Sequence, residues 1–195
     1  MSYLTKEEVQ NLLKIQTKSN LWFGNFDLFV EGFGRSIELS VALCSNSRTL
    51  TDRTVQTVNE VANLNRADYE SIVRLLFDDA MSWKAQAFSG DPPPPPQRGP
   101  MSWVRRIFQG PGAGMLSFDE SKHPLFEVNT PAGIEALIEW EYIFIDDAQE
   151  TVNRVAFLTC YPPWDVEHGR EIAICNGAPT GIGPIELDAY AYTDV

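Results

Sequence analysis

The sequence predicts an α+β domain in which an antiparallel sheet, arranged as a meander, packs against two or three helices, with a proline-rich loop excursion. Helical and strand-like segments are segregated along the chain rather than alternating, which disfavours a parallel doubly wound sheet. Several short runs alternate apolar and polar residues, as half-buried strands do. Asn176-Gly177 separates two such runs and is typical of a two-residue hairpin turn.

The first element expected is a short amphipathic helix. Thr5 and Glu8 have the spacing of a capping box. The positions that follow at helical spacing on one face are Val9, Leu12, Leu13 and Gln16. We therefore expect residues 1–20 to form a helical appendage to a single α+β domain at residues 21–195.

A β-hairpin should follow the helix. Residues 22–30 are rich in aromatic residues, and Phe26, Leu28 and Val30 share one parity. Residues 36–41 alternate strictly, with apolar side chains at every second position. The glycine-rich segment between the two runs is typical of a turn, so we expect a hairpin whose apolar parity faces the core.

Two helices are expected next. The first opens at residues 50–52 and has an apolar face made of Val55, Val58, Val61 and Ala62. Asn65 is a favourable N-cap for the second helix. Its apolar face follows a period near 3.6 residues and consists of Tyr69, Ile72, Val73, Leu76, Ala80 and Trp83.

A loop insertion at about residues 90–114 interrupts the domain. Five consecutive prolines there require an extended polyproline II segment. Thr130-Pro131 then signals the start of a short helix over residues 132–138. The remaining strands are expected at residues 140–145, 152–160, 170–175 and 182–187.

Composition bounds the class of protein. Cys44, Cys160 and Cys175 are odd in number and lack a CxxC spacing, which favours reduced, buried thiols and a cytoplasmic protein. The first residues do not resemble a signal peptide. No window approaches the roughly 20 apolar residues of a membrane span, so we expect no membrane association.

Charge is concentrated in the last third of the chain. Residues 131–195 carry twelve Asp and Glu against two Lys and Arg, a net charge of −10, whereas residues 1–130 carry fifteen against thirteen, a net charge of −2. Such a surface repels nucleic acid and attracts a basic protein partner. The carboxylates expected to contact that partner are Glu135, Glu139, Glu141, Asp146, Asp147 and Glu150.

The corner, defined as residues 164–169, combines functional groups that admit three interpretations. In the structural interpretation Asp165 accepts a backbone hydrogen bond, Glu167 and His168 bond across the turn, Gly169 supplies a positive φ, and Trp164 covers the core. In the second, Asp165, Glu167 and His168 bind a metal ion together with His123. In the third, a carboxylate and the imidazole act as general acid and base.

The Trp-Asp-x-Glu-His-Gly sequence of the corner resembles an uncharacterised bacterial domain family. The Asn176-Gly177 turn, a closing Ile182-Gly183 and the helix that starts at Thr130 fit the same resemblance, which covers roughly residues 22–185. The resemblance implies no established activity. It implies a likeness to the small acidic immunity-type proteins of bacterial toxin systems.

The favoured hypothesis is a non-enzymatic cytoplasmic protein that uses its acidic surface to bind a basic protein partner. An immunity-type protein that neutralises a basic toxin would be one such protein. No nucleotide-binding loop and no GxSxG nucleophile motif occurs, and no cofactor is expected. The alternatives are a metal-binding protein or metal-dependent enzyme that uses the corner, and a structural scaffold domain.

Overall fold

A computed structural model describes residues 3–18, 21–43, 50–88, 124–147 and 151–188. The proline-rich insertion at residues 90–114, His123 and Glu150 lie outside these described residues. Among the helices described, none combines the length and the apolar character that crossing a bilayer requires.

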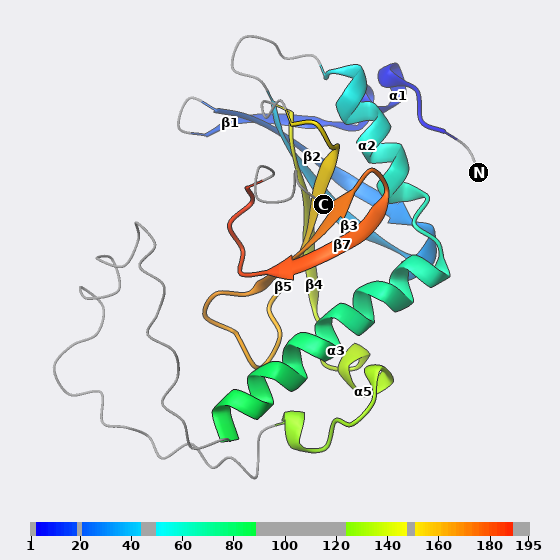
Figure 1. The fold of residues 1–195 in the computed structure, drawn as a ribbon. Coiled ribbons are helices and arrows are strands. Elements are labelled where there is room, and N and C mark those ends of the chain that lie inside the picture. Colours follow the sequence, from blue (N-terminus) through cyan, green and yellow to red (C-terminus); the bar gives the residue numbers. More distant parts are fainter. Residues whose placement is uncertain (1–2, 19–20, 44–49, 89–123, 148–150, 189–195) are drawn as a thin grey trace, which may run out of the picture.

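The described strands form one curled, seven-stranded sheet in which each strand lies beside the next in sequence (Figure 1). They are β1 (Lys14–Lys18), β2 (Leu21–Val30), β3 (Arg35–Leu43), β4 (Trp140–Asp146), β5 (Val155–Cys160), β6 (Arg170–Cys175) and β7 (Ala178–Gly183). Together with the helices they make an α+β fold, as the sequence predicts.

The sheet is mostly antiparallel, and the exception is the pair β3 and β4, which run parallel. A parallel pair needs a crossover connection, and the long segment between these strands contains α2 (Asp52–Ala62), α3 (Arg66–Phe88), η3 (Pro124–Phe126) and α5 (Pro131–Glu135). The predicted antiparallel arrangement therefore holds for every pair of neighbouring described strands except this one. Two antiparallel meanders, β1–β3 and β4–β7, are joined there.

The N-terminal segment differs from its prediction. α1 (Lys6–Leu12) begins with the expected capping box between Thr5 and Glu8, but Leu13 is already extended and the chain continues as β1. β1 pairs with β2, and a Cβ atom at Gly24 of β2 would lie 2.8 Å from Leu13 Cδ2. Glycine at this strand position thus makes room for Leu13, and pairing with β2 ends the helical pattern.

The β2–β3 hairpin and the two long helices agree with the sequence prediction. η1 (Glu31–Phe33) connects the strands, and the predicted inward parity is buried on both. Asn65 Oδ1 accepts from the backbone N–H groups of Ala67 and Asp68 at the start of α3. Thr130 caps α5, which ends at Glu135 and is shorter than predicted.

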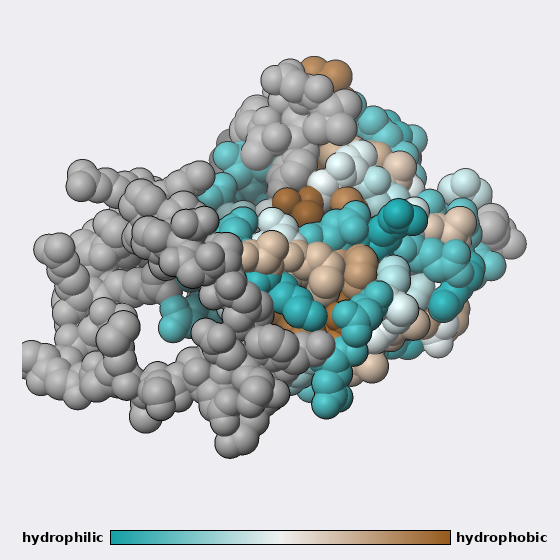
Figure 2. Space-filling model, turned by 60° about the horizontal axis from the view of Figure 1, so that its bottom comes forward, coloured by the Kyte–Doolittle hydropathy of each residue, from teal (hydrophilic) through white to brown (hydrophobic). Residues whose placement is uncertain are grey.

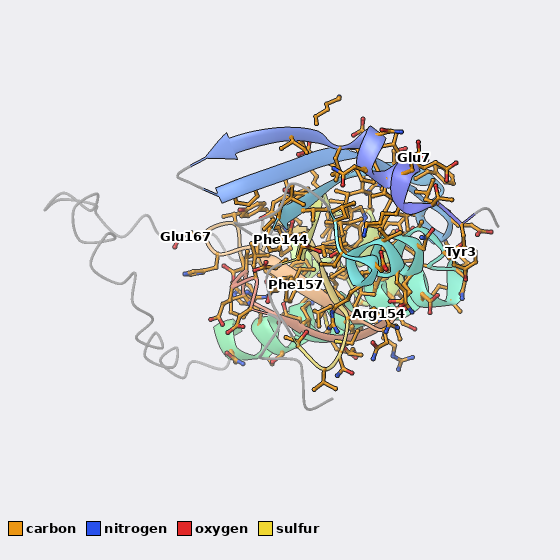
Figure 3. All side chains as sticks on the ribbon, turned by 90° about the horizontal axis from the view of Figure 1, so that it is seen from above. Tyr3, Glu7, Phe144, Arg154, Phe157 and Glu167 are labelled. Carbon is orange, nitrogen blue, oxygen red and sulfur yellow. The ribbon has the colours of Figure 1, made fainter. Side chains whose placement is uncertain are left out.

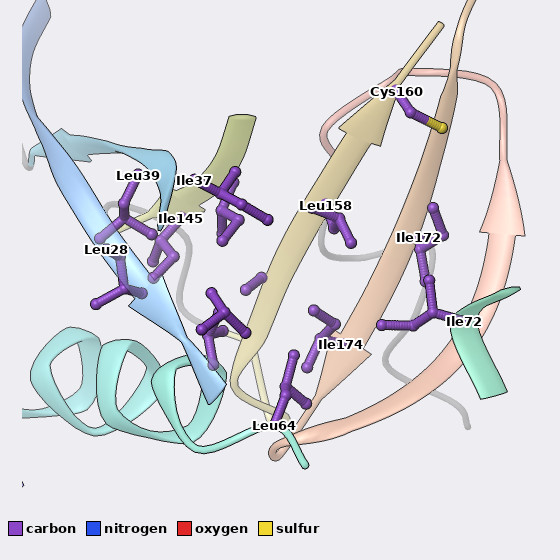
Figure 4. Packing of buried hydrophobic residues seen from close by; sticks show 14 of the residues in the cluster. Leu28, Ile37, Leu39, Leu64, Ile72, Ile145, Leu158, Cys160, Ile172 and Ile174 are labelled. Atoms are coloured by element: carbon purple, nitrogen blue, oxygen red, sulfur yellow. The ribbon is translucent and has the colours of Figure 1, made fainter. Parts of the chain in front are cut away.

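One face of the sheet and the helices share a single cluster of buried side chains (Figure 4). Leu28 and Leu39 enter it from the first meander, and Leu158 and Ile172 enter it from the second. Ile72 of α3 belongs to the same cluster. The main core therefore joins both meanders and the crossover helices.

A smaller cluster lies on the opposite face of the second meander. Val155 and Phe157 of β5 are buried there with Ala173 and Cys175 of β6. Phe144 of β4 packs against them, beside Phe157 in the sheet register (Figure 3). β5 is consequently buried on both faces.

Candidate functional site

The corner lies in the loop between β5 and β6, called here the β5–β6 loop (residues 161–169). Asp165 organises its backbone: its carbonyl accepts from Gly169 N at 2.9 Å, and its Oδ1 accepts from His168 N at 3.2 Å. Gly169 is buried with φ +66°, and a Cβ there would lie 3.0 Å from the Cys160 carbonyl oxygen. The corner therefore contains the carboxylate–backbone bond and the left-handed glycine that the sequence predicts.

A charged network connects the corner to α3. Arg170 Nε donates to Asp79 Oδ2 at 2.8 Å, and its Nη1 donates to Asp165 Oδ2. Trp164 Nε1 donates to the same Asp79 oxygen at 2.9 Å. Trp164 is 4% exposed and belongs to the main core. The first residue of the corner and the residue that directly follows the corner are thus held by one carboxylate of a helix that is remote in sequence.

Burial alone would lower the pKa of Arg170. The hydrogen bond and charge of Asp79, together with Asp165, outweigh burial and raise the pKa of this guanidinium above its ordinary value. Arg170 therefore remains a cation between two carboxylates. Charge-assisted hydrogen bonds of this kind are stronger than neutral ones, and they orient the loop.

The residues proposed as metal ligands do not all converge. His168 Nδ1 lies 2.8 Å from Asp165 Oδ1, but Glu167 is exposed and lies at the edge of the molecule in Figure 3. Across the described parts of the chain, no three His, Cys, Asp or Glu side chains gather in an arrangement that could hold a metal ion. His123, the fourth ligand proposed, is not among the described residues.

A buried thiol adjoins the β5–β6 loop. Cys160 ends β5 directly before the loop and is fully buried. Burial raises its pKa to about 12, against the smaller opposing effect of the Arg170 charge. Burial therefore disfavours the thiolate, the reactive form, at Cys160.

The carboxylates predicted to bind a partner are not gathered in one place. Glu139 and Glu141 are exposed at the start of β4, whereas Asp146 and Asp147 lie at its other end. A strand rises about 3.3 Å per residue, so roughly 15–20 Å separates the two pairs. The interval between them in sequence is short, but the extended strand carries the two pairs apart.

Two members of that predicted set have structural partners. Glu135 Oε1 accepts from the Tyr69 hydroxyl at 2.7 Å. Asp147 Oδ1 accepts from the Thr51 backbone N–H at 3.2 Å and from the Thr51 and Thr54 hydroxyls at the start of α2. A carboxylate at a helix N-terminus stabilises the helix through its dipole.

The β5–β6 loop carries two exposed apolar side chains that the sequence analysis did not single out. Tyr161 is 43% exposed and Val166 is 64% exposed. Burial raises the pKa of neighbouring Tyr142, and the charges of Tyr161 and Glu141 add to this effect. Tyr161 therefore lies near Tyr142 at this end of the sheet. The sequence did contain one indication of this exposed apolar surface, because Val166 is an apolar residue inside a polar turn.

A groove of about 440 Å³ runs between α3 and α5. Figure 2 turns the bottom of the molecule, where these helices lie, toward the viewer, and hydrophobic residues there alternate with hydrophilic ones. The Arg66 guanidinium lies 4.8 Å from the Tyr69 ring centre. Burial, followed by the hydrogen bond to Glu135, raises the Tyr69 pKa to about 12. Tyr69 is therefore a neutral hydrogen-bond donor at the edge of this groove.

Comparison with known proteins gives one match. Residues 114–189 match a domain of unknown function, DUF6985. No curated protein and no solved structure gives a significant match. The matched DUF6985 segment is less than half of the chain and includes α5, β4–β7 and the corner. The match agrees with the resemblance to an uncharacterised domain family.

Proposed function

We propose that this protein binds a basic protein partner through the acidic end of its second meander and catalyses no reaction. The binding surface is defined here as Glu139, Glu141, Tyr161, Val166 and Glu167. The observation that carries the proposal is the pairing of the two arginines in the last third of the chain, Arg154 and Arg170. Both are directed into internal ion pairs.

The first of these ion pairs joins β5 to α2. Arg154 directly precedes β5, and its Nη2 lies 2.5 Å from Glu60 Oε1 of α2, with both side chains mostly buried. Arg170 contacts Asp79 and Asp165 in the same manner, at 14% side-chain exposure. These cations neutralise internal carboxylates, two of which belong to α2 and α3. Residues 131–195 carry more carboxylates than cations, and those exposed at the surface, such as Glu139, Glu141 and Glu167, attract and orient a basic partner.

Exposed apolar groups supply the second requirement of a protein interface, and they lie in the β5–β6 loop, which begins where Cys160 pairs with Trp140 of β4. Protein interfaces combine a small apolar or aromatic centre with a polar rim. Tyr161 and Val166 offer such a centre, and Glu139 and Glu141 offer an acidic rim. Tyrosine is frequent among the residues that contribute most to binding.

A basic toxin is the partner that the resemblance to immunity-type proteins favours. Tight, charge-steered association with a basic enzyme would place an acidic surface over a positively charged active site. The DUF6985 match is compatible with this form of the proposal but names no activity. The specific proposal is therefore an immunity-type role, and the general proposal is acidic protein recognition.

Affinity capture with cross-linking at low salt, followed by binding measurements on the captured protein, tests the proposal. We expect a basic protein whose affinity falls steeply between about 50 and 500 mM salt, because salt screens charge steering. The double variant Glu139→Gln/Glu141→Gln should bind about tenfold more weakly, mainly through a slower association rate. Tyr161→Ala should instead accelerate dissociation.

The double variant Asp27→Asn/Glu31→Gln is the matched control. It removes the same charge from exposed positions on β2 and η1, in the first meander. We expect its affinity to stay close to that of the unaltered protein. Capture of no basic protein, or affinity that is indifferent to salt and to the Glu139/Glu141 change, would exclude the proposal.

A further inference from the structure

The segment that follows β7 folds back over the sheet and is held by a buried carboxylate. We propose that residues 184–188 form a detachable strap, a short cover that opens and closes over the second face of the β4–β7 meander while the rest of the fold stays intact. This inference is independent of the proposed binding role. It rests on three features of the described residues: the attachment point, the backbone of Leu187 and the surface beneath it.

The attachment point is Glu171 on β6, which is 1% exposed. Its Oε2 accepts from the backbone N–H of Glu186 at 3.0 Å and from that of Leu187 at 2.8 Å. Glu171 is paired in register with Gly183, the last residue of β7. The carboxylate is therefore placed where the chain leaves the sheet, and one oxygen atom holds two consecutive amides of the strap.

Leu187 itself has a strained backbone. Its φ is +54°, in the left-handed region that residues with a β-carbon rarely adopt. Such a conformation persists only where surrounding contacts hold it. Here those contacts are the bond to Glu171 and packing of the Leu187 side chain.

The Leu187 side chain packs against the smaller apolar cluster. This cluster contains Phe157 and Val155 of β5 and Ala173 of β6, on the face of the sheet opposite the main core. Thr159 faces Glu171 across the strands on that same face and is also buried. The side chain that holds the strap beside this largely apolar surface is therefore a carboxylate rather than an apolar group.

The choice of a carboxylate explains why the strap can detach. Burying a charge is unfavourable unless hydrogen bonds compensate for it, and in the closed state the strap amides provide part of that compensation. When the strap opens, water reaches Glu171 and replaces those bonds, and the strained Leu187 backbone relaxes. Opening thus leaves no buried charge unsatisfied, so it requires less free energy than global unfolding.

Native-state hydrogen exchange of the unaltered chain is the primary test. We expect the amides of Glu186 and Leu187 to exchange at least about tenfold faster than the amide of Ile172 in β6. The free energy of the opening that exposes them should not change at low urea concentrations. Identical exchange free energies and urea dependence for strap and core amides would show that the strap opens only on unfolding. That result would overturn the proposal.

Substitutions at the attachment point provide the second test. Glu171→Ala should accelerate exchange of the two strap amides about tenfold further while the Ile172 amide keeps its protection. If Glu171→Ala fails to fold, Glu171→Gln, which keeps an acceptor oxygen but loses the charge, should give a smaller acceleration in the same direction. Glu186→Gln is the control, since it changes an exposed side chain of the strap and retains its amide. Strap exchange unaffected by both Glu171 substitutions would refute the attachment.

Discussion

Asp79 shows how much a single side chain can organise. One of its oxygen atoms accepts from both Trp164 and Arg170, although Arg170 is 91 positions away in sequence. The adjacent Asp78 is exposed and contributes to none of these contacts. Both residues are aspartates, and their roles differ because their side chains leave α3 in different directions around the helix axis.

We expect Asp79→Ala to lower the free energy of unfolding by about 2–4 kcal/mol, because it leaves the buried indole N–H and a largely buried guanidinium without their shared acceptor. Asp78→Ala removes the same charge and should stay within about 0.5 kcal/mol of the unaltered protein. Urea unfolding at neutral pH measures both. Equal effects of the two substitutions would contradict the network described for the corner.

At the scale of elements, the turns of this fold depend on glycines in the left-handed region. Gly34 ends the η1 turn with φ +64°, and Gly169 ends the corner with φ +66°. Their backbones are nearly the same but their surroundings are not. Nothing lies within 4 Å of a Cβ atom built at Gly34, whereas one built at Gly169 would lie 2.6 Å from Ile185 Cδ1. Comparing substitutions at Gly34 and Gly169 therefore distinguishes the cost of a left-handed backbone from the cost of a steric clash.

Gly34→Ala should cost about 1–2 kcal/mol, the ordinary penalty for a β-carbon in the left-handed region. Gly169→Ala should cost about 1–3 kcal/mol more, because the added methyl group also meets the Cys160 carbonyl and the Tyr161 ring. Thermal and urea unfolding of both variants supply the comparison. If Gly169→Ala were no less stable than Gly34→Ala, the β5–β6 loop would accommodate the added methyl group at no cost, and the steric part of this prediction would be wrong.

At the scale of the molecule, the two meanders depend on one another. The main cluster of buried side chains draws on β2 and β3, on β5 and β6, and on both crossover helices. The parallel pair of β3 and β4 joins the two meanders, and it requires the long crossover connection between these strands. We therefore expect neither meander to keep its structure alone.

The consequence is a single cooperative unfolding transition. Leu158, 1% exposed in the middle of the core, is the probe. Leu158→Ala should destabilise the protein by about 2–5 kcal/mol and shift the transitions seen by tryptophan fluorescence and far-ultraviolet circular dichroism equally. Two separated transitions, or a shift in only one signal, would indicate that the meanders unfold independently.

Local signals in the sequence were sufficient for much of the fold. The caps at Thr5, Asn65 and Thr130, the Asn176-Gly177 hairpin and the inward parity of β2 and β3 all appear as predicted. Each depends on residues a few positions apart, whose side chains and backbone interact whatever the rest of the chain does. The corner's Asx bond and positive φ belong to this group for the same reason.

Other features required the tertiary structure, because they depend on residues brought together from distant positions. Pairing with β2 turned residues 14–18 from a predicted helix into a strand. The crossover made β3 and β4 parallel, and the length of β4 divided the acidic residues into two groups. Asp79 and Glu171 acquired their partners in the same way. Composition determined how much negative charge the chain carries, but the path of the backbone decided which carboxylates face water and which hold the fold.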